Sequence, residues 1–271
     1  SLLPVSKGAE SRVIAISDSE DNLGELTQLL NTLHLENLIP FIVNVRKISP
    51  ATFIGKGKLE EIKSICEEEK VDGVVLDFDL SPNQMRNLEK GIGRPTIDRS
   101  GIILEIFSQH AQTKESKTQV ELAKLKYLLP RLAHFWNHFE RQRGGIGMKG
   151  MGESQLEVDR RLLKDRMALL EKRLKGIERN RNVQRSSRKD ILKVALVGCT
   201  NAGKSTLLNG LTHSHVTAEN KLFATLDSSV RALDPDHHPP IVAIDTVGFI
   251  NRIPPDLIAS FRLACYALDP P

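Results

Sequence analysis

Residues 198–206 constrain this chain more than any other segment. They read Gly-Cys-Thr-Asn-Ala-Gly-Lys-Ser-Thr and match the phosphate-binding pattern G-x-x-x-x-G-K-[ST]. The apolar run 191–197 precedes them, as a buried parallel strand would, and residues 204–211 read as the start of a helix. A strand, a glycine turn and a helix start direct backbone N–H groups and the positive end of a helix dipole to one point. We therefore expect an anion site, in which Lys204 contacts phosphates and Ser205 binds Mg²⁺.

A second motif follows the apolar run 241–244, where Asp245-Thr246-Val247-Gly248 reads D-x-x-G. At a strand end this carboxylate can hold Mg²⁺ through water, and the glycine N–H can contact a γ-phosphate. Between the motifs, the segment 222–227 places Thr225 where a mobile loop would bring a hydroxyl to the metal. Such loops form a nucleotide-dependent switch. For Thr225 alone, a plain surface threonine stays an open alternative.

The predicted nucleotide site comprises Gly198, Cys199, Thr200, Asn201, Ala202, Gly203, Lys204, Ser205, Thr206, Phe223, Ala224, Thr225, Leu226, Asp227, Asp245, Thr246, Val247 and Gly248. Within it, Ser205, Thr225 and Asp245 are the expected metal ligands, with Asp245 acting through water. Lys204, Thr225 and Gly248 are the expected catalytic residues.

A chain of 271 residues is long enough for two or three domains. Residues 1–112 alternate strand-like runs, at 12–16, 41–45 and 73–78, with helical patterns, which predicts a small parallel α/β domain. Residues 113–187 read as a helical hairpin. Residues 188–271 read as the first half of a phosphate-loop domain. The expected fold class is therefore α/β with a helical insertion.

Apolar residues at helical spacing predict two packed helices in the hairpin, on either side of the glycine-rich loop 144–152. The loop cannot hold a helix, because glycine loses more conformational entropy there than any other residue. The expected seam residues are Leu122, Leu125, Leu129, Leu132, Leu156, Leu163, Met167, Leu170, Leu174 and Ile177.

Positive charge is concentrated in the second of these helices. The net charge of the chain is +4, yet residues 156–190 hold twelve Lys/Arg against six Asp/Glu. A basic helix that is preceded by the glycine-rich loop 144–152 favours a polyanionic partner such as structured RNA. A solvated charged helix or a plain interdomain coiled coil remains the alternative. The candidate RNA contacts are Arg141, Arg143, Gly144, Gly145, Lys149, Arg160 and Arg161.

Several segments together resemble the HflX family of translation-factor-related GTPases. They are the phosphate loop, the D-x-x-G motif, and residues 54–61, 80–89, 119–123, 143–147, 152–157 and 159–161. The resemblance implies a GTPase that binds GTP or GDP with Mg²⁺ and associates with ribosomal RNA of the large ribosomal subunit. It also implies splitting or rescue of stalled ribosomes under stress, with the glycine loop directed toward the peptidyl-transferase region.

Two departures qualify the expected chemistry. Phe249 follows D-x-x-G where many GTPases have a glutamine that orients the attacking water, so intrinsic hydrolysis should be slow. A partner or a monovalent cation would then supply the missing groups, and the resemblance implies K⁺ held near Asn201. The base-selecting N-K-x-D motif does not occur before Pro271, so guanine specificity rests on the resemblance, and we expect a C-terminally truncated form.

The three cysteines lie far apart, and no run reaches transmembrane length, so we expect a cytoplasmic monomer without disulfides or an integral membrane segment. Two other functions remain open. One is an RNA- or ribosome-binding module whose truncated nucleotide domain is inactive. The other is an ATP-using RNA remodeller, because no residue present forbids adenine.

Overall fold

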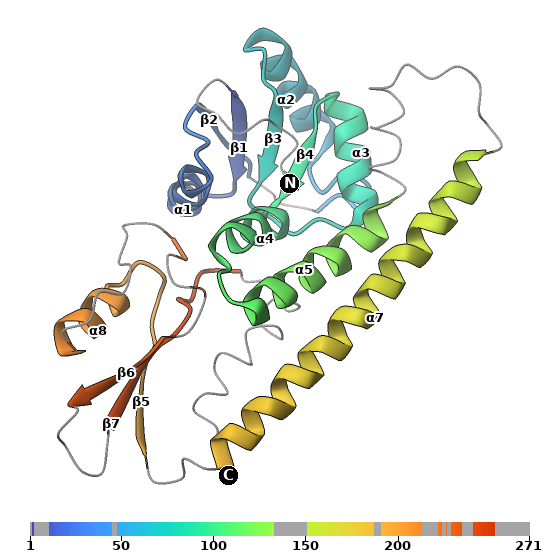
Figure 1. Cartoon of the computed structure of the whole chain (residues 1–271). Coiled ribbons are helices and arrows are strands. Elements are labelled where there is room, and N and C mark those ends of the chain that lie inside the picture. The colour runs from blue at the N-terminus through green and yellow to red at the C-terminus, as the bar shows by residue number, and fades with distance from the viewer. Residues whose placement is uncertain are drawn as a thin grey trace. The chain divides into compact units, whose positions relative to one another are not determined.

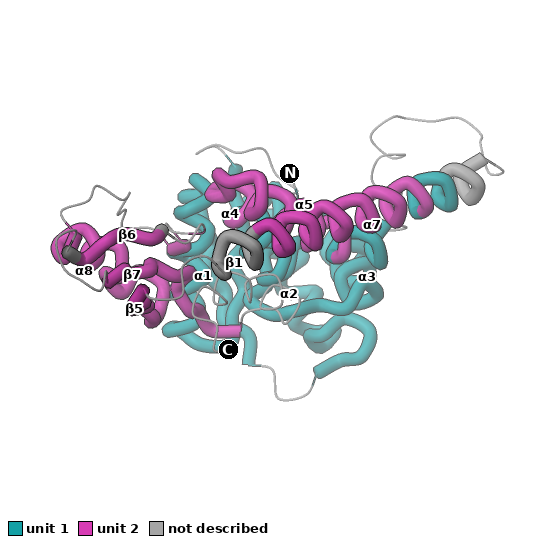
Figure 2. The backbone as a smooth tube through the Cα atoms, turned by 60° about the horizontal axis from the view of Figure 1, so that its bottom comes forward, with its two compact units in different colours: residues 1–106, 127–160 teal, residues 107–126, 161–271 magenta. Residues whose placement is uncertain are grey.

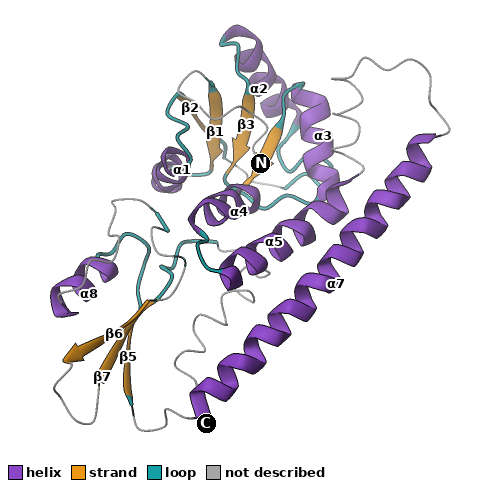
Figure 3. Ribbon diagram, in the orientation of Figure 1, coloured by secondary structure: helices purple, strands orange, loops and turns teal. Residues whose placement is uncertain are grey.

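The computed structural model of the chain describes residues 2, 11–44, 48–132, 151–186, 191–212, 222–223, 226, 229–234 and 241–252. They form two compact units, coloured separately in Figure 2: residues 1–106 with 127–160, and residues 107–126 with 161–271. Each unit contains a β-sheet accompanied by helices (Figure 3), so the predicted α/β class is confirmed. Within the described ranges, no helix is both long and apolar enough to cross a membrane.

The sheet of the first unit is parallel throughout, in the order β2-β1-β3-β4 (Figure 1). Its strands are β1 (Val13–Ser17), β2 (Leu38–Ile42), β3 (Gly73–Leu76) and β4 (Thr96–Asp98). Every residue of β1 and β3 is buried, as expected for central strands covered by helices on both faces. This confirms the parallel α/β arrangement predicted for the N-terminal region.

The predicted residue range of one strand was shifted along the sequence. The apolar run 41–45 was expected to form it, whereas β2 begins three residues earlier, at Leu38, and ends at Ile42. Pro40 lies inside the strand. Because β2 is at the edge of the sheet, the missing N–H of Pro40 need not interrupt a ladder on both sides.

Helices α1 (Glu20–Thr32), α2 (Lys56–Glu68) and α3 (Pro82–Ile92) follow the strands, as the predicted alternation of strands and helices requires. At the start of α3, the Gln84 N–H donates to Ser81 Oγ, and the Ser81 N–H donates to Gln84 Oε1. With Pro82 in the first turn, this capping box satisfies N–H groups that have no partner within the helix. Local sequence thus fixes where α3 begins.

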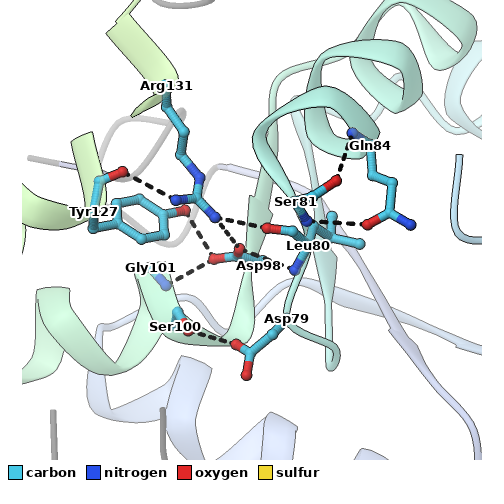
Figure 4. Close-up of polar contacts among 9 residues, drawn as sticks. All are labelled: Asp79, Leu80, Ser81, Gln84, Asp98, Ser100, Gly101, Tyr127 and Arg131. Carbon is cyan, nitrogen blue, oxygen red and sulfur yellow. Dashed lines mark hydrogen bonds and ion pairs between the residues drawn. The ribbon is translucent and has the colours of Figure 1, made fainter. Parts of the chain in front are cut away.

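A buried polar cluster joins the end of β4 to the segment after residue 126 (Figure 4). The Asp98 carboxylate accepts hydrogen bonds from Tyr127 Oη at 2.8 Å, Arg131 at 3.1 Å and the Gly101 N–H at 2.9 Å. Arg131 also donates to the carbonyl of Leu80 at 2.7 Å. Burial raises the pKa of Asp98, while the nearby Arg131 charge acts in the opposite direction. These bonds fix the C-terminal edge of the sheet.

Helix α4 (Arg99–His110) follows β4 directly and was not predicted. Its Arg99 side chain is buried and forms ion pairs with Asp77, at the end of β3, and with Glu25 of α1. The two carboxylates compensate a cation that would otherwise be costly to bury. The seven consecutive residues 101–107 are all buried, so this part of the helix has no exposed face.

The hairpin prediction corresponds to α5 (Lys114–Leu128), the 3₁₀ turn η1 (Leu129–Arg131) and α7 (Met151–Ser186). Along α7, Leu156, Leu163, Met167, Leu174 and Ile177 are partly buried and Leu170 is fully buried, whereas most residues between them are exposed. The predicted seam is thus confirmed on this helix. The loop was expected to extend through Gly152, which was wrong at this end, because α7 already begins at Met151.

Among the described residues of the second unit, three strands form a sheet in the order β5-β7-β6. Strand β5 (Leu192–Leu196) pairs parallel with β7 (Ile241–Asp245), and β6 (Ser229–Asp234) pairs antiparallel with β7. Helix α8 (Lys204–Thr212) follows the phosphate loop. The parallel strand before the loop is confirmed, but its predicted burial is not, because Leu192 and Val194 are 57% and 40% exposed.

Candidate nucleotide site

The phosphate loop connects the end of β5 to the N-terminus of α8, in the order that the sequence predicted. Two residues of the turn have positive φ, Asn201 at 58° and Gly203 at 83°. Glycine adopts this region without strain, and asparagine tolerates it better than most residues. The turn leads directly into the first turn of α8, whose N–H groups have no partner within the helix. The loop therefore has the backbone arrangement expected of an anion site, and its phosphate binding stays a prediction.

Lys204 is the first residue of α8, and its side chain folds back onto the phosphate loop. Its Nζ donates to the carbonyl oxygen of Cys199 at 2.7 Å. Partial burial lowers the pKa of the Lys204 ammonium, and the charge of Asp245 acts in the opposite direction. Because an ammonium has three donors, one bond to the loop leaves two that can contact phosphate oxygens. The phosphate contact of Lys204 stays a prediction.

Ser205 and Asp245 meet at the point where α8 and β7 approach each other. The Ser205 hydroxyl donates to Asp245 Oδ2 at 2.5 Å, and Asp245 is fully buried. A serine hydroxyl that donates its proton in this way can still bind a cation through its oxygen. Hydroxyl, carboxylate, phosphate and water oxygens are the ligands that Mg²⁺ prefers. The two residues therefore fit Mg²⁺, which Ser205 would bind directly and Asp245 through water.

The D-x-x-G segment contacts the phosphate loop through its backbone. The Phe249 N–H donates to the Gly198 carbonyl at 3.0 Å, and the Thr200 N–H donates to the Phe249 carbonyl at 2.7 Å. Between these bonds, a Cβ placed on Gly248 would lie 2.6 Å from the Thr200 backbone nitrogen. Only glycine allows this approach. Thr246 adds a bond from its hydroxyl to the Leu196 carbonyl at 2.7 Å.

The segment before the predicted switch threonine also reaches the phosphate loop. The Phe223 N–H donates to Thr200 Oγ1 at 2.8 Å, and the Phe223 side chain is buried. Leu226 is buried as well. Ala224, Thr225 and Asp227 lie outside the described residues, so the metal role of Thr225 stays a prediction.

The predicted RNA contacts are only partly described. Arg160 and Arg161 lie exposed on α7, while Arg141, Arg143, Gly144, Gly145 and Lys149 lie outside the described residues. One cation and one carboxylate of α7 are paired with α5: Arg166 contacts Glu121 at 2.6 Å, and Glu171 contacts Lys126 at 3.8 Å. Both pairs are about half exposed, so each contributes little to stability. The pairing supports packing of α5 against α7, and Arg160 and Arg161 remain accessible to solvent.

Sequence reasoning missed three features of this site. The backbone pairing of Phe249 has no side-chain signature, since the side chain itself is 51% exposed. The hydroxyl of Thr200 was not expected to bind the Phe223 segment. His110 and Phe107 contact Phe223 from a distant part of the chain, and no local pattern indicates such a contact.

Comparisons with known proteins agree with this geometry. Three family models match consecutive parts of the chain: "GTP-binding GTPase N-terminal" over residues 20–108, "GTP-binding GTPase Middle Region" over 110–188 and "50S ribosome-binding GTPase" over 193–265. A solved structure described as SsGBP in complex with GDP matches 93% of this chain and 67% of its own, with 25% identity and a TM-score of 0.53. The fold is therefore that of a P-loop GTP-binding protein.

Sequence relatives narrow the assignment. The GTPase HflX of Magnetococcus marinus is 49% identical over 243 residues, which cover 89% of this chain and 56% of the relative. The GTPase HflX of Escherichia coli is 45% identical over 247 residues, which cover 90% of this chain and 58% of the relative. The chain belongs to the HflX family, and it spans somewhat more than half the length of these relatives.

Proposed function

We propose that this protein binds GTP with Mg²⁺ in the phosphate loop, hydrolyses the GTP, and acts on the large ribosomal subunit. The observation that carries the first part is the arrangement of Lys204, Ser205 and Asp245 around one helix N-terminus. Lys204 offers two donors to the phosphates, while Ser205 and Asp245 offer oxygens to the metal. Bound Mg²⁺ would neutralise charge on the β- and γ-phosphates. Gly248, held against Thr200, would present its N–H to the γ-phosphate.

The same site lacks a side chain that orients water. Phe249 occupies the position of the usual glutamine, and its ring carries no hydrogen-bonding group. Its backbone N–H and carbonyl already pair with Gly198 and Thr200. We therefore expect slow intrinsic hydrolysis that a ribosomal partner or a monovalent cation accelerates. If Asn201 helps to hold K⁺, hydrolysis will be faster in K⁺ than in Na⁺ at equal ionic strength, and equal rates would reject the cation.

Guanine recognition and ribosome action rest on family membership. The relatives are named GTPases, and the model matching residues 193–265 is described as a 50S ribosome-binding GTPase. The exposed basic helix α7 supports an RNA partner, because counterion release from phosphates drives binding to such surfaces. We infer that the protein splits or rescues stalled ribosomes under stress, as a cytoplasmic monomer. The glycine-rich loop 144–152 would then contact ribosomal RNA.

Nucleotide titration of the full-length protein tests the proposal. GTP should bind tightly only with Mg²⁺ present, ATP should not compete, and Lys204→Ala should weaken GTP binding at least about tenfold by removing the phosphate contact. Lys193→Ala is the matched control, since Lys193 is exposed on β5 and outside the site. Competition by ATP would favour the ATP-using remodeller. Ribosome co-sedimentation without any nucleotide binding would favour a binding module with an inactive nucleotide domain.

A further inference from the structure

Phe223 has a backbone conformation that a bulky residue rarely adopts. Its φ is 57°, in the left-handed region, and its side chain is only 1% exposed. Such a conformation costs free energy and persists only where the surroundings hold the residue in place. The contacts that hold Phe223 therefore indicate what this position does.

Both backbone polar groups of Phe223 bind side chains from different parts of the second unit. Thr200 Oγ1, in the phosphate loop, accepts the Phe223 N–H at 2.8 Å. His110 Nδ1, in the last turn of α4, lies 2.6 Å from the Phe223 carbonyl oxygen. Because a carbonyl oxygen only accepts, Nδ1 of His110 must carry the proton in this contact.

The ring of Phe223 forms the third contact. It meets Phe107, one turn before His110 on α4, edge to face, with ring centroids 4.7 Å apart and planes at 79°. This is a favoured geometry for aromatic pairs. Phe223 is thus held by α4 through its ring and carbonyl, and by the phosphate loop through its N–H.

Thr200 contacts both Phe223 and the D-x-x-G segment. Its hydroxyl binds Phe223, its N–H binds the Phe249 carbonyl at 2.7 Å, and its backbone lies against Gly248. A displacement of Phe223 would therefore also displace Thr200, which packs against Gly248. A triphosphate and a diphosphate differ at the γ-phosphate, to which Gly248 is expected to respond.

We propose that His110 is a positioning residue for nucleotide discrimination. By holding the Phe223 carbonyl, it keeps Thr200 against Gly248 and favours the triphosphate-bound arrangement. The end of α4 is thereby linked energetically to the phosphate loop. This inference rests on the proposed function, because it assumes that the loop binds guanine nucleotides.

The test compares the affinities of full-length variants for GTPγS and GDP, both with Mg²⁺. His110→Leu keeps the bulk and removes the donor, whereas His110→Asn places an amide N–H near the position of Nδ1. We expect His110→Leu to weaken GTPγS binding about tenfold relative to GDP binding, the effect of losing one partly buried hydrogen bond, and His110→Asn to restore most of it. Gln109→Leu, an exposed neighbour on the same helix, is the matched control.

Other outcomes overturn the inference. An unchanged GTPγS-to-GDP ratio, or an equal loss of both affinities, would leave His110 with a structural role only. A stronger GTPγS affinity in His110→Leu would mean that the bond between His110 and Phe223 favours the GDP-bound arrangement instead. If thermal unfolding shows that His110→Leu is poorly folded, Phe107→Leu replaces it, because it removes the aromatic contact with Phe223 and should lower the same affinity ratio while the His110 donor stays. Failure of the wild-type protein to bind GTP would reject the proposed function instead.

Discussion

At the scale of single residues, close backbone approach shapes the site as much as charged groups do. Gly248 is usually considered for its N–H, but here the absence of a side chain is equally important. A Cβ at this position would enter the space of the Thr200 backbone. Backbone atoms cannot rotate away as a flexible side chain can, so the contact tolerates glycine alone.

Replacing Gly248 by alanine should therefore weaken nucleotide binding. The added methyl group has to push Thr200 away, which breaks the Phe249 bonds to the phosphate loop at a cost of about 2 kcal/mol, or roughly thirtyfold in affinity. Calorimetric titration with GTPγS measures the effect. Gly210→Ala is the control, because Gly210 lies in α8 with nothing within 4 Å of its Cβ position. The Gly210→Ala variant should bind GTPγS normally and unfold at a slightly higher temperature, because alanine favours helices more than glycine does. Equal affinities of the two variants would contradict this interpretation.

Ionisation of Cys66 should make the stability of the fold depend on pH. Burial raises the pKa of this thiol from 9.0 to about 11. In the unfolded chain the thiol ionises earlier, so the stability that Cys66 contributes is complete below pH 9 and is lost as the pH rises toward 11. Urea unfolding at about pH 8 and pH 10.5 should show a larger loss of stability for the wild type than for Cys66→Ala. Parallel losses would show that other groups cause the dependence.

At the scale of elements, helix boundaries follow local chemistry, and strand boundaries depend on neighbours. The start of α3 is fixed by Ser81, Pro82 and Gln84, which lie next to one another in the sequence. The start of β2 depends on its pairing with β1, where Val13 lies opposite Leu38. A run of apolar residues can supply several registers, and the sheet selects one of them.

Ser81→Ala should destabilise the first unit by about 1 kcal/mol, because Gln84 loses its acceptor and the capping box is broken. Urea denaturation followed by circular dichroism measures the change. Ser64→Ala, at an exposed position inside α2, removes the same hydroxyl without a cap and should be neutral or slightly stabilising. If both variants lose equal stability, the cap does not contribute.

At the scale of the molecule, the chain combines two compact units with an uneven distribution of charge. Helices α4, α5 and α7 each contribute residues to both units, so the units share elements instead of meeting at one linker. The predicted domain boundaries at 112 and 187 remain predictions. The basic helix α7 carries the exposed Arg160 and Arg161, which offer the clearest test of an RNA partner.

Replacing Arg160 and Arg161 with alanine should weaken binding to the large ribosomal subunit and flatten its salt dependence. Each lost phosphate contact reduces the slope of log K against log salt by about one. Co-sedimentation at several salt concentrations measures that slope. Lys63→Ala with Lys90→Ala removes the same charge from exposed positions of α2 and α3 and should leave the slope unchanged. An unaltered slope in the arginine variant would support the plain coiled-coil interpretation.

Much of the fold could be predicted because its signals are local. The phosphate loop, the D-x-x-G strand, the cap of α3 and the seam of α7 are each contained in a short stretch of sequence. Strand β4 and helix α4 could not be recognised in this way. The strand has only three residues, and most of α4 is buried, including the charged Arg99 and Glu105, so neither shows the periodicity of a half-exposed element.

The candidate site divides in the same way. The sequence by itself determined its chemistry: a lysine and a serine at a helix start, and a carboxylate at a strand end, follow from spacing alone. Only the tertiary structure decided how these groups are held together. Gly248 packs against Thr200, and Phe223 connects Thr200 to His110, which lies 113 residues earlier in the chain. Local spacing specifies which groups an element presents, whereas contacts between distant segments depend on how the whole chain packs.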